Sequence, residues 1–106
     1  MTFNEYQQRA LETNKYGDDL KLIALEIASE AVELAGKVKK IYRDKGGVID
    51  AVGHAQLNAE LGDILWGVAV FAAALGGDLE GIAQMNTWKL EDRAKRGVIH
   101  GEGDER

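Results

Sequence analysis

The sequence predicts an all-α protein, a four-helix bundle with an irregular C-terminal tail, in one domain that spans residues 1–106. Proline is absent and the helix formers Ala, Leu, Glu and Lys are common, which argues against a strand-rich fold with frequent turns. Apolar residues recur at spacings of three and four, the period of an amphipathic helix. Glycines interrupt these stretches and divide the chain into four helices.

The first helix is expected at about residues 3–14. Thr2 and Glu5 match a capping box, in which each side chain bonds the backbone N–H of the other residue. Tyr16-Gly17 ends this helix.

The second helix is expected at about residues 19–43, with Asp18 or Asp19 as its N-cap. Its apolar residues step by three and four along one face, and they are Leu20, Ile23, Ile27, Ala31, Leu34, Val38 and Ile41. Gly46-Gly47 ends the helix.

The third helix is expected from about residue 50 to residue 75. Its second half is apolar all round, which predicts the most buried element, covered on more than one side. Asp78 is a good N-cap for a fourth helix at about residues 79–95. The segment 97–106 contains three glycines and is expected to be irregular.

Composition excludes several classes of protein. The net charge is −5 and there is no long basic block, so we expect no contact with nucleic acid. Cysteine is absent, which excludes disulfides and thiolate metal sites and fits a reducing cytosol. The N-terminus lacks the features of a signal peptide, and the longest apolar run, Ile64–Leu75, is shorter than the roughly 20 residues that cross a bilayer. We therefore expect a cytoplasmic protein that does not contact membranes.

The length of the chain also favours association. A core built from 106 residues is modest, and an all-round apolar third helix is hard to cover within one small bundle. We expect a homodimer, or a homotetramer built from dimers, with closed symmetry.

Two acidic pairs carry the chemistry. Glu30 and Glu33 form one pair, and Glu60 and Asp63 form the other. Each pair has i, i+3 spacing, so both carboxylates of a pair project to the same side of a helix. Two such helices running antiparallel bring four carboxylates together, an arrangement that suits Mg²⁺, with Mn²⁺ as its substitute.

Asp63 is the only charged residue between Leu61 and Gly77. A buried unpaired carboxylate is costly, so Asp63 needs a partner, which is either a metal ion or a lysine. With a second acidic pair upstream, we favour the metal. Glu26 lies one turn before Glu30 and is either a further ligand or the acceptor of a proton from water.

A phosphate substrate also needs cations from the protein. The fourth helix carries Lys89 and Arg93 at i, i+4 spacing, with Asn86 nearly one turn before Lys89. The alternative for all three residues is ordinary solvation of a helix surface. Trp66 and Trp88 either belong to the core or stack on a nucleotide base.

These residues resemble the MazG-like branch of the all-α nucleoside triphosphate pyrophosphohydrolases. That family carries Glu-x-x-Glu followed, after a loop, by Glu-x-x-Asp. The resemblance spans nearly the whole chain, and its order and spacing are more specific than any one motif. The segments that carry it are Ala24–Lys40, Glu60–Trp66, Met85–Leu90 and Arg96–Arg106.

The resemblance implies a hydrolase that acts on phosphoric anhydrides. With Mg²⁺, such an enzyme cleaves a (d)NTP between the α- and β-phosphates, giving a nucleoside monophosphate and pyrophosphate. The resemblance implies that the four carboxylates of the acidic pairs bind the metal. Glu30 and Glu33 are then catalytic residues as well, and we add Glu26 by our own inference. The resemblance also implies that Asn86, Lys89 and Arg93 meet the substrate, and that sites are built between subunits.

The chain departs from the family pattern at Glu26–Glu30, where many relatives have Gly-Leu-x-Gly-Glu and some have an extra Glu in place of Ser29. Two alternatives remain. Phosphoribosyl-ATP pyrophosphohydrolase has a related fold and related acidic motifs, although Glu60–Trp66 is closer to the MazG-like pattern. A non-catalytic helical oligomerisation or regulatory module is the other, and the four retained carboxylates argue against it.

Overall fold

The computed structural model describes residues 1–104 and residue 106, and in this part of the chain it contains helices and no strand. The four expected helices are all present. They are α1 (Phe3–Leu11), α2 (Leu20–Lys45), α3 (Ala51–Ala74) and α4 (Leu79–Arg96). The predicted all-α class is confirmed.

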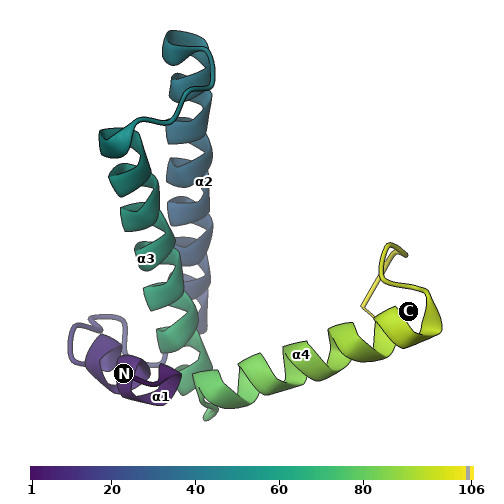
Figure 1. Cartoon of the computed structure of the whole chain (residues 1–106). Coiled ribbons are helices and arrows are strands. Elements are labelled where there is room, and N and C mark those ends of the chain that lie inside the picture. Colours follow the sequence, from purple (N-terminus) through teal and green to yellow (C-terminus); the bar gives the residue numbers. More distant parts are fainter. Residues whose placement is uncertain (105) are drawn as a thin grey trace.

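Helices α2 and α3 form a long antiparallel hairpin (Figure 1). Gly46 ends α2 in the left-handed conformation, with φ of 60°, as a glycine C-cap does. Asp50 then caps α3 by accepting a hydrogen bond of 2.7 Å from the backbone N–H of Gly53, and it receives Lys45 Nζ at 2.8 Å. The turn thus directs α3 back along α2, so the two helices that carry the acidic pairs lie side by side.

Helix α1 closes one end of this hairpin, where α3 ends (Figure 1). The buried Gln7 side chain donates to the backbone oxygens of Ala69 and Gly77 at 3.1 and 3.3 Å, and it accepts from the backbone N–H of Leu79. A small core joins the same elements and consists of Ala10, Ala69, Ala72 and Leu79, with Tyr6, Trp66 and Val68 packed against it. Gln7 therefore ties α1 to the end of α3 and the start of α4.

Helix α1 ends at Leu11, three residues earlier than expected. Local side-chain hydrogen bonds end it: the Thr13 hydroxyl donates to the backbone oxygen of Ala10, and Asn14 bonds both Tyr16 and Gly17. Such bonds compete with the helical pattern of the backbone.

Helix α4 does not lie along the hairpin. It starts against α1 and the end of α3 and extends away, without contacting α2 among the described residues (Figure 1). Large apolar side chains of α4 are consequently exposed, Met85 by 73% and Trp88 by 69%. On the hairpin, Leu25 and Val32 of α2 and Leu61 of α3 are exposed as well. A single chain therefore leaves several apolar faces uncovered, and the oligomer expected from the sequence stays a prediction.

Helix α3 contacts the other three helices, as its apolar sequence predicted. It is also long and apolar enough, by length and composition alone, to cross a membrane, although the shorter run Ile64–Leu75 is not. The core helix of a soluble protein passes the same test, and Glu60 and Asp63 near the middle of α3 are costly in a bilayer.

Candidate metal centre

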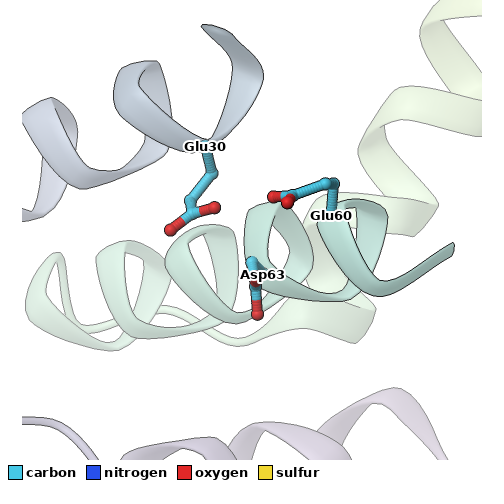
Figure 2. Close-up of side chains that lie close together, drawn as sticks. All are labelled: Glu30, Glu60 and Asp63. Atoms are coloured by element: carbon cyan, nitrogen blue, oxygen red, sulfur yellow. The ribbon is translucent and has the colours of Figure 1, made fainter. Parts of the chain in front are cut away.

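The two acidic pairs meet between α2 and α3. Carboxylate oxygens of Glu30, Glu60 and Asp63 all lie within 4.8 Å of one another, and we call these three residues the acidic cluster. Figure 2 shows Glu30 reaching from α2 toward α3, which carries the other two. The i, i+3 spacing on α3 places Glu60 and Asp63 on adjoining faces of that helix, so both reach the same region.

Glu33 and Glu26 border the acidic cluster on α2. Glu33 is exposed and does not belong to the three closest carboxylates, but it is the neighbour with the largest effect on the pKa of Glu30. Glu26 accepts a hydrogen bond of 3.1 Å from the Tyr16 hydroxyl. The pKa of Glu30 is raised to about 8. Glu33 has the largest effect, followed by burial, Glu26 and Glu60. Several carboxylates therefore lie close to Glu30, and they destabilise its charged form.

Two carboxylate oxygens of the acidic cluster lack partners. Glu30 Oε2 and Glu60 Oε2 are buried, and neither has a hydrogen-bond partner in the described part of the chain. Lys37 Nζ lies 2.6 Å from the other oxygen of Glu60 and lowers the pKa of Glu60. Buried carboxylate oxygens without partners are destabilising unless a proton or a cation compensates them.

The residues present fit a hard divalent cation. The acidic cluster offers three carboxylate oxygens, the ligand type that Mg²⁺ and Mn²⁺ prefer, and its two unpartnered oxygens are available for coordination. The alternative for Asp63, an ion pair with a lysine, is not seen in the described residues, where Lys37 pairs with Glu60 instead. The expectation that Asp63 is buried is wrong for the single chain, because its side chain is exposed, and its case as a ligand rests on its proximity to Glu30 and Glu60.

The raised pKa of Glu30 predicts a pH-dependent stability of the metal-free protein. The folded-state pKa, about 8, lies above the ordinary value of 4.5, so the folded state binds the proton more tightly than the unfolded state does. The resulting stabilisation is full below the ordinary pKa and is lost as the pH rises through the folded-state pKa. In chelator, the melting temperature should therefore fall by several degrees between about pH 5 and pH 8. Glu30→Gln should flatten this decline, and an equally steep decline in that variant would contradict the assignment.

The sequence pattern does not identify two contacts beside the acidic cluster. Tyr16 is expected only as part of a helix stop, yet it bonds Glu26; its ring also meets Trp66 edge-on, with centroids 6.2 Å apart. Trp66 Nε1 donates to Thr13 Oγ1 at 2.8 Å, so this tryptophan holds the loop that carries Tyr16. The second contact is the ion pair between Lys37 and Glu60. No local sequence pattern predicts it, because the two residues lie on different helices.

The expected substrate residues lie on α4, and the structure does not bring them to the acidic cluster of the same chain. Asn86 and Lys89 line an open, mostly apolar groove of about 340 Å³ together with Ile82, Met85 and Trp88. Lys89 and Arg93 both form ion pairs with Asp104 in the tail.

Comparison with known proteins agrees with the acidic motifs. The family described as the MazG nucleotide pyrophosphohydrolase domain matches residues 19–98. The gene 37 protein of Mycobacterium phage L5 is 46% identical over 89 residues, which cover 84% of this chain and 78% of that protein. No solved structure matches the chain. The match to the family includes both acidic pairs and the whole of α4, and it confirms the predicted resemblance: this chain belongs to the MazG nucleotide pyrophosphohydrolase family.

Proposed function

We propose that the protein is a Mg²⁺-dependent nucleoside triphosphate pyrophosphohydrolase that converts a (d)NTP to a (d)NMP and pyrophosphate. The observation that carries the proposal is the acidic cluster with its two buried, unpartnered oxygens, located inside a MazG domain. The neighbouring carboxylates destabilise the charged form of Glu30, so a protein that only needed a folded hairpin would gain stability by losing that carboxylate.

We assign a role to each carboxylate of the site. Glu30, Glu60 and Asp63 hold the cation, with Glu33 beside them as a fourth ligand. When bound, Mg²⁺ or Mn²⁺ neutralises phosphate charge and lowers the pKa of a coordinated water. Glu26 is held by the Tyr16 hydroxyl through one carboxylate oxygen, and its other oxygen accepts the proton of the attacking water.

The phosphates and the base are held by α4. Lys89 supplies the cation for the β- and γ-phosphates, and Asn86 supplies an amide for a sugar or phosphate oxygen. Both residues line the groove that contains the exposed Trp88, whose ring offers a stacking surface for a base. The side chain of Arg93 is only 5% exposed and is paired with Asp104, so we assign the direct phosphate contact to Lys89.

A complete site requires two copies of the chain in this proposal. Within one chain, α4 extends away from the hairpin that carries the acidic cluster. In a homodimer, or a homotetramer built from dimers, α4 of one copy can cover the hairpin of the other and bury the exposed apolar side chains of both. We place α3 in this interface and not in a membrane, and we propose a cytoplasmic protein whose partner is a nucleotide, without nucleic acid.

The bond that is cut provides the test. Lys89 stabilises pyrophosphate as the leaving group, with further charge compensation that a bound divalent cation would supply, so water should attack the α-phosphate. The purified protein should be screened with NTPs, dNTPs and phosphoribosyl-ATP in Mg²⁺, and the best substrate hydrolysed in ¹⁸O-labelled water. We expect the label in the nucleoside monophosphate and none in pyrophosphate.

Three other outcomes contradict this proposal. Label in inorganic phosphate would show cleavage at the γ-phosphate. Turnover of phosphoribosyl-ATP alone would favour that related activity. Absence of turnover with every substrate would favour a non-catalytic helical module.

A further inference from the structure

The C-terminal tail folds back onto α4 through a set of arginine contacts. Gly97 ends α4 with φ of 72°, and Gly103 has φ of 78°, so two left-handed positions reverse the direction of the chain. The Arg106 guanidinium then donates to the backbone oxygens of Val98 at 3.0 Å and Ile99 at 2.9 Å. These bonds join Arg106 to the residues that follow α4, in a segment whose described residues have no regular secondary structure.

This path places Asp104 on the two cations of α4. Asp104 Oδ1 accepts from Lys89 Nζ at 2.9 Å and from Arg93 Nη2 at 3.1 Å, and Arg93 Nη2 also donates to the backbone oxygen of Asp104 at 2.5 Å. The pKa of Asp104 is lowered, mostly by Lys89 and then by Arg93, so its carboxylate stays ionised at neutral pH.

Lys89 and Arg93 differ in exposure, and the difference assigns their roles. Arg93 is 5% exposed and touches both the backbone and the carboxylate of Asp104, so it anchors the tail. Lys89 is 37% exposed. Its ammonium has three N–H groups, of which Asp104 occupies one and leaves two for other acceptors. A free lysine loses rotamer entropy when it is fixed, and the bond to Asp104 supplies part of that ordering before substrate binds.

We propose that Asp104 is a positioning residue for phosphate binding. Anchored by Arg93, it holds the ammonium of Lys89 at the rim of the groove and presents the two remaining N–H groups to the β- and γ-phosphates. This inference rests on the proposed function, because it assigns to Lys89 the phosphates of a nucleoside triphosphate.

The test is Asp104→Ala in the full-length protein, with steady-state kinetics on the best triphosphate. KM should rise roughly fivefold, the order expected from an exposed ion pair and the lost ordering of one lysine. The change in kcat should be smaller, because the acidic cluster is untouched. Calorimetry with pyrophosphate and Mg²⁺ should show weaker binding by a similar factor, without any turnover. Asp104→Glu should recover part of the wild-type KM.

A double-mutant cycle separates positioning from a general effect on the tail. If Asp104 acts through Lys89, then Asp104→Ala should have little effect in a Lys89→Ala background. Glu102→Ala is the matched control, since Glu102 is an exposed tail carboxylate that forms no ion pair with α4 in the described residues. This control should keep the wild-type KM.

Each contrary result has its own meaning. If the wild type hydrolyses a triphosphate and Asp104→Ala leaves KM unchanged, the positioning role is wrong while the proposed function stands. A lower KM in Asp104→Ala would also overturn it, because the carboxylate would then be a competitor of phosphate. If the wild type hydrolyses no triphosphate, the proposed function fails and this inference fails with it.

Discussion

Replacing Asp63 with asparagine should reduce turnover by at least about a hundredfold at saturating Mg²⁺, which corresponds to roughly 3 kcal/mol of transition-state stabilisation. The substitution keeps the shape of the side chain but removes one negative charge from the acidic cluster, whose oxygens lie within 4.8 Å of one another. The measurement is kcat on the best triphosphate, with circular dichroism to confirm that the helices are retained.

The thermal stability of the same variant gives a second readout. Without metal, Asp63→Asn should melt at the same temperature as the wild type or higher, because one source of repulsion is gone. With Mg²⁺, the wild type should be stabilised by mass action, and the variant should lose most of that stabilisation. Loss of activity together with a lower metal-free melting temperature would indicate damage to the fold.

Asp44→Asn is the matched control. Asp44 is an exposed carboxylate near the end of α2, bonded to the adjacent Arg43 and separate from the acidic cluster. It should keep wild-type kcat and the wild-type response to Mg²⁺. If Asp63→Asn behaves as this control does, the proposed metal centre is wrong.

Most helix ends could be predicted because capping is local chemistry, although α1 ends earlier than expected, at Leu11. Thr2 and Asp78 cap their helices as expected, and Gly46 ends α2. Asp19, one of two candidates, is the N-cap of α2. The direction of α4 could not be predicted, since an apolar stripe shows that a face is covered but does not show by which element.

The acidic cluster could also be predicted in part from the sequence. The i, i+3 spacing puts both carboxylates of a pair on one side of its helix, and the short turn between α2 and α3 sets the register that brings Glu30, Glu60 and Asp63 together. The offset of Glu33 depends on how α2 is rotated about its axis, which the sequence does not specify. The contact between Lys37 and Glu60 joins different helices, and no local pattern predicts it.

A composite site predicts that two defective subunits can restore each other. Asp63→Asn removes a carboxylate from the hairpin, and Lys89→Ala removes a cation from α4. In a heterodimer of these variants, one site carries both substitutions and the other carries neither. Such a heterodimer, co-expressed with two affinity tags and purified on both, should recover about half of the wild-type kcat/KM per dimer, while each parent homodimer stays far below that value.

The matched control pairs Asp63→Asn with Glu60→Gln. Both residues belong to α3 of the hairpin, so every acidic cluster in that heterodimer carries one substitution, and no activity should return. If the first heterodimer is no more active than its parents, the acidic cluster and Lys89 act within one chain, and α4 must then fold back over its own hairpin. Light scattering that gives the mass of one subunit at micromolar concentration would exclude the composite site before any kinetics are measured, because a monomer cannot bring α4 of a second copy to the hairpin.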